Sequence, residues 1–248
     1  MNELKYNKVN TKVNFNKLVL DKKKILGSGM FGSVYEAYNG KNRNNKLVVK
    51  KTHKNIGLQF FSLIMNGEFQ GSMFKKEVDA LKYLSKQGIA PKIYYSDETK
   101  MIYIIEKLDY TLTDMLYNNK FNASHLKNLI EIFNKLKSTP FKHTDLHTSN
   151  IMYSVKNKQF YIIDWGIFKI QKSCLKNISK KKTTTKTKKN CYNFTNRNLK
   201  YIDNLFIYIL TYINTTKNTN KKTQMKKYLL KFLELFNVNS IKELEEII

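Results

Sequence analysis

Residues 141–152 carry the side chains in this sequence that best suit chemistry. They read F-K-H-T-D-L-H-T-S-N-I-M, so His143, Asp145 and Asn150 stand among apolar residues that favour burial. Asp164 directly follows a second apolar run. Asp145 can accept a hydroxyl proton, and Asn150 and Asp164 offer the hard oxygen ligands that Mg²⁺ prefers. Phosphoryl transfer requires this combination of a carboxylate for the nucleophile and ligands for a metal.

A glycine-rich segment could hold the phosphates for such a reaction. Gly27, Ser28, Gly29 and Gly32 lie in G-S-G-M-F-G-S-V, which fits the pattern G-x-G-x-x-G-x-V. Glycine lets the backbone approach a phosphate closely. Residues 33–38 alternate as a strand does, which excludes a dinucleotide-binding turn because that turn leads into a helix. An ordinary tight hairpin remains the alternative for this motif alone.

Lys50 and Glu77 form a second candidate pair. Lys50 ends the apolar run V-V-K, and Glu77 lies in a helix predicted over 73–87. The apolar positions of that helix recur at intervals of three and four, at Phe74, Val78, Leu81 and Leu84. Glu77 faces the same side as Leu81, and a Lys–Glu ion pair can direct an ammonium group at nucleotide phosphates. Taken singly, a surface lysine and a solvated glutamate would explain both residues.

Two regions of different secondary structure position these residues, and they meet near residue 107. Before it, we predict the helix at 73–87 and strands over 24–26, 33–38, 47–49, 92–95 and 101–105. After it, we predict a short β pair around 151–164 and helices over 110–118, 122–139, 198–213 and 223–236. The fold class expected from this arrangement is α+β.

In this order the motifs resemble those of the eukaryotic-type protein kinases. That family combines a Gly-rich loop, a strand lysine, a helix glutamate, H-R-D-L-x-x-x-N and D-F-G. This sequence matches them with the glycine motif, Lys50, Glu77, H-T-D-L-H-T-S-N at 143–150 and D-W-G at 164–166. The resemblance implies a bilobal protein-kinase-like fold with an antiparallel β-rich N-lobe and a reduced, mainly α-helical C-lobe. Residues 1–248 would form one kinase domain, with the N-lobe at 1–107 and the C-lobe at 108–248, truncated after the helix that carries Asp203.

The resemblance also implies ATP and Mg²⁺ as cofactors and assigns a role to each candidate residue. Lys50 would contact the α- and β-phosphates beside Glu77, Asp145 would be the catalytic base, and Asn150 and Asp164 would be metal ligands. The nucleotide would be held by Gly27, Ser28, Gly29, Gly32, Val34, Val48, Lys50, Glu106, Leu108 and Met152. The implied function is transfer of the γ-phosphoryl group of ATP to a Ser or Thr hydroxyl of a protein.

Several positions depart from the family pattern. Thr144 replaces the usual Arg, His147 stands where protein-Ser/Thr kinases carry Lys, and no A-P-E follows. D-L-H-x-x-N-I with a later I-D-W is also similar to the aminoglycoside phosphotransferases, so a small-molecule kinase is the first alternative. The intact Gly-rich loop with Val34 favours the protein kinase. The small build and G-I-A-P-K-I at 88–93 resemble kinases of large cytoplasmic DNA viruses.

Composition limits the remaining function classes. The chain has 248 residues, of which 42% are hydrophobic, so a mostly disordered protein is excluded. Lys+Arg 45 against Asp+Glu 19 gives a net charge of +26, which suggests nucleic acid. Arg43 and Arg197 are the only arginines, however. The abundance of Lys together with Asn is typical of proteins from AT-rich genomes, which explains the charge without a nucleic-acid partner. Non-specific attraction to nucleic acid is still expected, and a basic nucleic-acid-binding or scaffold protein on a kinase fold is the second alternative.

The lysine-rich segment 179–190 lies in the expected activation segment, so a preference for acidic protein substrates is expected. Cys174 and Cys191 are the only cysteines, which excludes a disulfide framework and favours a reducing intracellular compartment. No secretory signal and no membrane span are expected from the apolar runs. We expect a monomer located inside the cell, or in the host cytoplasm or virion if the chain is viral.

Overall fold

The computed structural model describes residues 18–29, 32–39, 42–52, 73–171, 194 and 201–247. The chain forms two compact units. The first comprises residues 1–85 and 91–107, and the second comprises 86–90 and 108–248. Within the described ranges, no helix has both the length and the apolar character that crossing a bilayer requires.

The first unit is built on a five-stranded antiparallel sheet with the order β1-β2-β3-β5-β4. Its strands are β1 (Leu18–Gly29), β2 (Gly32–Asn39), β3 (Asn42–Thr52), β4 (Ile93–Asp97) and β5 (Ile102–Glu106). Ala37, Leu47, Val49 and Ile104 form a buried apolar cluster on this sheet. The five strands predicted before residue 107 are therefore confirmed.

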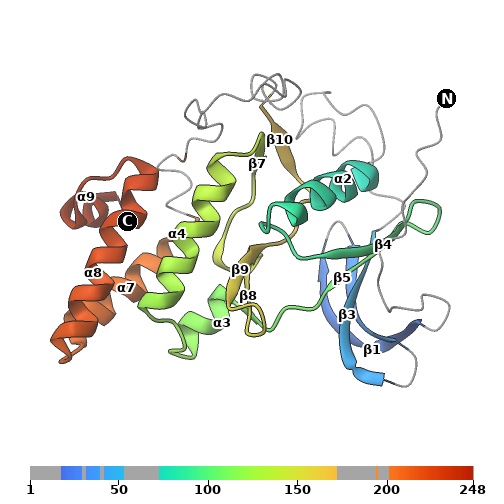
Figure 1. The fold of residues 1–248 in the computed structure, drawn as a ribbon, viewed down its shortest axis with the longest axis horizontal. Helices are drawn as coiled ribbons and strands as arrows, with labels where there is room; N and C mark the ends of the chain where they lie inside the picture. Colours follow the sequence, from blue (N-terminus) through green and yellow to red (C-terminus); the bar gives the residue numbers. More distant parts are fainter. Residues whose placement is uncertain are drawn as a thin grey trace. The chain divides into compact units, whose positions relative to one another are not determined.

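Helix α2 (Met73–Lys86) carries the apolar positions predicted for it. Phe74, Val78, Leu81 and Leu84 are all buried. Phe74 contacts Tyr103 of β5 with the ring centroids 6.1 Å apart, which places α2 against the sheet (Figure 1). The helix ends just before Gly88, which adopts the left-handed conformation, with φ +67°, that favours glycine.

The second unit is mainly helical. Its helices are α3 (Leu112–Tyr117), α4 (Ala123–Lys137), α7 (Asp203–Thr215), α8 (Thr219–Leu233) and α9 (Ile241–Ile247). Two 3₁₀ turns, η2 (Thr148–Asn150) and η3 (Glu234–Phe236), add to them. One small sheet has the order β6-β8-β9 and the other pairs β10 with β7. These strands are β6 (Tyr110–Thr111), β7 (Phe141–His143), β8 (Ile151–Ser154), β9 (Gln159–Ile162) and β10 (Phe168–Ile170).

Aromatic side chains fill the core of the second unit. Helix α4 packs against both α8 and β9 (Figure 1). Phe133 of α4 lies 5.1 Å from both Phe194 and Phe232, measured between ring centroids. Phe206 of α7 and Phe236 of η3 contact Phe232 in turn. Large rings joined in this way bury much apolar area and link helices that are distant in sequence.

The structure differs from the predictions at several places, and the helix predicted over 198–213 is α7, which runs from Asp203 to Thr215. Helix α8 begins at Thr219 because the Asn218 side chain accepts a hydrogen bond from the Lys221 amide, whereas the apolar pattern begins only later in the helix. Residues 110–111 form β6, and Thr111 then caps α3. The pairing of β7 with β10 was not predicted, because three-residue strands have no detectable periodicity.

Strands β2 and β3 approach each other closely at Gly32. A Cβ atom at Gly32 would lie 2.4 Å from the Lys51 carbonyl oxygen, whereas one at Gly29 would meet nothing within 4 Å. We therefore expect Gly32→Ala to lower the free energy of unfolding by about 1–3 kcal/mol, because backbone must shift to relieve the contact. Urea unfolding of Gly32→Ala and Gly29→Ala would measure this difference. Equal stabilities would contradict the close packing at Gly32.

One buried histidine, His143, and one half-buried histidine, His125, make stability depend on pH. Burial lowers the pKa of His143 and of His125 below the ordinary value of 6.5. Below about pH 6.5 the unfolded chain therefore binds protons that the folded chain does not bind. The contribution of these histidines to the free energy of unfolding is fully present above that pH and is lost as the pH falls. We expect the urea midpoint to fall between pH 7.5 and 5.5, with His143 alone contributing at most about 1.4 kcal/mol per pH unit.

His125 provides the matched control for this pH effect. Its Nδ1 accepts a hydrogen bond from the Asn122 amide in the capping box of α4. Glutamine can accept the same hydrogen bond without titrating. His125→Gln is therefore expected to keep the helix and to reduce the dependence of the urea midpoint on pH. A urea midpoint that does not change with pH in the wild-type protein would contradict the prediction.

Candidate active site

His143 ties together the two segments that carry the candidate residues. Its Nδ1 accepts a hydrogen bond from the Asp145 amide at 3.2 Å, and its Nε2 donates to the Ile163 carbonyl at 2.9 Å. These two bonds require the neutral ring with the proton on Nε2. The side chain is fully buried, and burial lowers the pKa of the imidazole despite the opposing charges of Asp164 and Asp145. His143 is thus a neutral link between Asp145 and the residue before Asp164.

Further contacts fix the segment around Asp164. Thr144, at the position where the family carries Arg, donates from Oγ1 to the Ile167 carbonyl at 2.9 Å. Trp165 is fully buried, donates from Nε1 to the Ile162 carbonyl, and packs 4.6 Å from the His143 ring. Asp164 itself adopts a φ of +57°, a conformation that aspartate tolerates better than most residues and that is common at functional positions.

Asn150 directs its amide nitrogen at a backbone carbonyl of the same loop. Nδ2 donates to the Asp145 carbonyl at 2.9 Å and lies 3.0 Å from Nε2 of His147. The carbonyl is only an acceptor, so the orientation of the amide follows from this contact. Oδ1 is the remaining polar atom of the side chain and is a suitable ligand for a hard cation.

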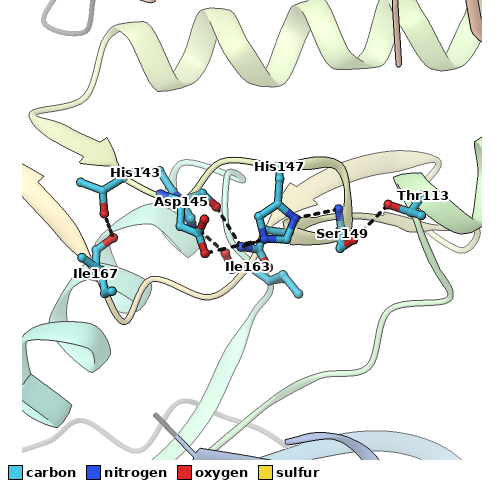
Figure 2. Close-up of polar contacts among 9 residues, drawn as sticks. Thr113, His143, Asp145, His147, Ser149, Ile163 and Ile167 are labelled. Atoms are coloured by element: carbon cyan, nitrogen blue, oxygen red, sulfur yellow. Dashed lines mark hydrogen bonds and ion pairs between the residues drawn. The ribbon is translucent and has the colours of Figure 1, made fainter. Parts of the chain in front are cut away.

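His147 caps the turn on which Asn150 lies. Its Nδ1 accepts a hydrogen bond from the Ser149 amide at 3.2 Å, and its Nε2 lies 3.7 Å from Oδ2 of Asp145. Thr113 of α3 contacts the hydroxyl of Ser149 at 3.0 Å (Figure 2). This capping role of His147 was not predicted from the sequence. Its place directly before a short polar turn was the available signal for a cap.

Asp145 is the exposed member of this group. Its side chain has 57% of its surface accessible, whereas Asn150 is buried. Figure 2 shows Asp145 and His147 from the same loop with Ile163 beside them. An exposed carboxylate can reach a hydroxyl group that arrives from solvent, while the buried amide stays fixed.

The second unit thus offers an amide oxygen and a carboxylate for a divalent cation. Ile163 donates its backbone hydrogen bond to the Asn150 carbonyl at 2.9 Å, so the backbone next to Asp164 lies beside Asn150. Among the described residues, no three His, Cys, Asp or Glu side chains converge as a metal-binding group. A site of Asn150 and Asp164 fits Mg²⁺, which uses few protein oxygens and retains water and phosphate as further ligands.

Lys50 and Glu77 meet in the first unit. Nζ of Lys50 lies 2.7 Å from Oε1 of Glu77, and the two side chains are 10% and 4% exposed. The residues come from β3 and α2, so the pair joins the helix to the sheet. A buried ion pair of this kind needs further hydrogen bonds to offset the loss of water.

The other predicted nucleotide-binding residues are placed separately in the two units. Val48 and Leu108 are buried, and Val34, Glu106 and Met152 are half-buried. Gly27, Ser28 and Gly29 form the exposed end of β1, where Ser28 Oγ lies 3.0 Å from Ser33 Oγ of β2. Leu108 and Met152 belong to the second unit and the rest to the first. Their common role in holding a nucleotide stays a prediction.

Asp203, predicted to lie inside a helix over 198–213, is instead the first residue of α7. Its Oδ1 accepts a hydrogen bond from the adjacent Asn204 amide at 2.6 Å. The segment 179–190, on which the expected substrate preference rests, lies outside the described residues.

Comparison with known families points to the same family as the order of the motifs in the sequence. The model of the protein kinase domain family matches residues 20–191. The chain belongs to the protein kinase family. The bilobal α+β fold class predicted from the motifs is thereby confirmed, with a β-rich first unit and a helical second unit.

Two curated kinases are similar to this chain. A "probable serine/threonine-protein kinase" of fowlpox virus is 29% identical over 164 residues, which cover 61% of this chain and 53% of that protein. A "probable cyclin-dependent kinase 8" of Dictyostelium discoideum is 30% identical over 166 residues, covering 61% of this chain and 41% of that protein. The matches thus span about half of the length of these relatives. The predicted resemblance to kinases of large DNA viruses is confirmed by the first.

Solved structures are also similar to this chain. The kinase PK-1 of Cydia pomonella granulovirus has a TM-score of 0.43 at 20% identity, covering 62% of this chain and 53% of that one. A homolog of Stt7 from Micromonas algae, soaked with ATP, has a TM-score of 0.46 at 13% identity, covering 63% of this chain and 51% of that one.

Proposed function

We propose that this kinase transfers the γ-phosphoryl group of ATP to Ser or Thr hydroxyls of a protein, with Mg²⁺ as the metal. The observation that carries the proposal is the loop at 143–150. It holds an exposed carboxylate, Asp145, next to an amide whose oxygen remains for a cation, Asn150. The buried Lys50–Glu77 pair supports the same reaction, because it supplies a fixed positive charge.

Each of these residues has a separate task in the proposal. Asp145 accepts the proton of the attacking hydroxyl and orients its oxygen. Asn150 and Asp164 hold Mg²⁺, which when bound neutralises charge on the phosphate oxygens. Lys50, held by Glu77, contacts the α- and β-phosphates. The remaining nucleotide contacts are proposed for Gly27, Ser28, Gly29, Gly32, Val34, Val48, Glu106, Leu108 and Met152.

A small-molecule kinase is the second candidate, and His147 is the observation that favours it. Protein kinases place a flexible lysine at this position, whereas His147 is engaged with Ser149, Asn150 and Asp145 in the loop. An imidazole held in this way cannot reach as far as a lysine, which suggests that this kinase binds the acceptor differently.

One experiment separates the two kinase functions. The protein would be incubated with Mg²⁺ and γ-labelled ATP, either with a protein mixture or with a panel of aminoglycosides, sugars and choline. The proposal expects label on Ser or Thr of proteins. Label on a small molecule alone would support the alternative and refute the protein kinase. A basic binding or scaffold protein would show neither, and its nucleic-acid binding would persist without ATP turnover.

The substrate and location remain parts of the proposal. A net charge of +26 favours acidic protein substrates, and raised salt should then increase the KM for such a substrate more than the KM for ATP. Action as a monomer in an intracellular compartment, either the host cytoplasm or the virion if the chain is viral, belongs to the same proposal.

A further inference from the structure

Glu77 accepts two hydrogen bonds on one carboxylate oxygen. Besides Nζ of Lys50 at 2.7 Å, Oε1 receives the hydroxyl of Tyr103, also at 2.7 Å. Both donors and the acceptor are buried, with Lys50 8%, Tyr103 2% and Glu77 3% exposed, so bulk water competes little for these hydrogen bonds. A hydroxyl that donates to a buried carboxylate forms one of the stronger hydrogen bonds in proteins.

The register of the sheet places Tyr103 at this point. Lys50 of β3 and Tyr103 of β5 are direct partners in the antiparallel ladder, so their side chains extend from the same face. Nζ of Lys50 lies 5.9 Å from the centroid of the Tyr103 ring. One face of the sheet therefore presents the ammonium and the hydroxyl together to α2.

The Tyr103 ring also supports the helix that carries Glu77. Phe74 lies almost one turn before Glu77 on α2, and its ring contacts that of Tyr103 at 6.1 Å. Tyr103 therefore contacts α2 twice, through the ring of Phe74 and through a hydrogen bond to Glu77. A rotation or displacement of α2 would break the bond from Tyr103 and the ion pair with Lys50 together.

We propose that Tyr103 is a positioning residue that keeps Glu77 paired with Lys50. The inference rests on the proposed function for its effect on activity, but its structural part concerns the first unit alone. With Tyr103 the buried carboxylate has two donors. Without the Tyr103 hydroxyl the carboxylate has, among the residues that the structure describes, only the Lys50 ammonium as a donor. Conformations in which Glu77 is separated from Lys50 then become more populated.

The test removes the hydroxyl and keeps the ring. Tyr103→Phe is expected to lower kcat/KM for phosphotransfer about tenfold, within what the loss of one hydrogen bond to a charged group can produce. The matched control is Tyr95→Phe on the neighbouring β4, whose hydroxyl donates to Asp97 at 3.3 Å. We expect that control to retain wild-type kinetics.

A second readout does not depend on activity. Acetylation by isotopically labelled acetic anhydride, followed by mass spectrometry of peptides, would report how often Lys50 is exposed. We expect Lys50 to react several-fold faster in Tyr103→Phe, while the exposed Lys51 reacts at an unchanged rate. If Tyr103 acts through Glu77, then adding Tyr103→Phe to Glu77→Gln should not raise the rate for Lys50 further.

The outcomes separate the two proposals. Unchanged labelling of Lys50 in Tyr103→Phe, or equal increases in the wild-type and Glu77→Gln backgrounds, would overturn the positioning role. Faster labelling in a protein that transfers no phosphate would support the positioning role while refuting the proposed function.

Discussion

Asp145→Asn is expected to lower kcat for phosphotransfer by about 10²–10⁴-fold, because the amide cannot accept the hydroxyl proton. The side chain of Asp145 is 57% exposed, and its backbone amide, which the substitution keeps, makes the bond to His143. Stability should therefore change little. Autophosphorylation and substrate phosphorylation with γ-labelled ATP, at matched protein concentrations, would measure the loss.

The control for this substitution is Asp79→Asn. Asp79 is an exposed residue of α2, so its replacement also removes one surface carboxylate. It should retain wild-type turnover. If Asp145→Asn retained the kcat of the wild type, Asp145 would not be the base, and the assignment of the loop at 143–150 would be wrong.

Lys50→Met is expected to have the second large effect. Removing the ammonium takes a fixed positive charge from the phosphates, and losing one such group typically costs about 10²–10³-fold in kcat. The neighbouring Lys51 is exposed on the same strand, so Lys51→Met changes the net charge equally and should be nearly silent. A steady-state assay over a range of ATP concentrations would measure both variants.

The same substitution should also affect folding. Lys50→Met leaves Glu77 buried with the Tyr103 hydroxyl as a remaining donor, and we expect a loss of about 3 kcal/mol in the free energy of unfolding. Replacing both partners, in Lys50→Met with Glu77→Leu, should restore most of this stability because no buried charge is left unpaired. Activity should stay low in the double variant. Recovery of activity together with stability would show that Lys50 serves only the fold.

The sequence predicted the elements of the first unit well because each has a local signal. The intervals between Phe74, Val78, Leu81 and Leu84 specify a helix with one buried face, and Gly88 marks its end. The strands were recognised from short alternating or apolar runs. Burial of one face determines such elements whatever their final neighbours are.

Prediction was weaker where an element depends on a distant partner. The strands β7 and β10 are three residues each and exist because Phe168 pairs with His143. The first turn of α8 lacks apolar residues and is specified by the Asn218 cap. Neither feature produces a periodic pattern, so the boundaries there were displaced or missed.

The order and spacing of motifs were enough to identify a protein kinase and to name Lys50, Glu77, Asp145, Asn150 and Asp164 as its candidate residues. The residues that hold them in place emerged only from the folded chain. Tyr103 and Glu77 are separated by 26 residues, and the hydroxyl reaches the carboxylate only because β5 pairs with β3 in one register. The neutral form of His143 likewise follows from an amide and a carbonyl on two different segments. Residue types reveal which chemistry is available, whereas hydrogen-bond partners depend on long-range packing that no local pattern encodes.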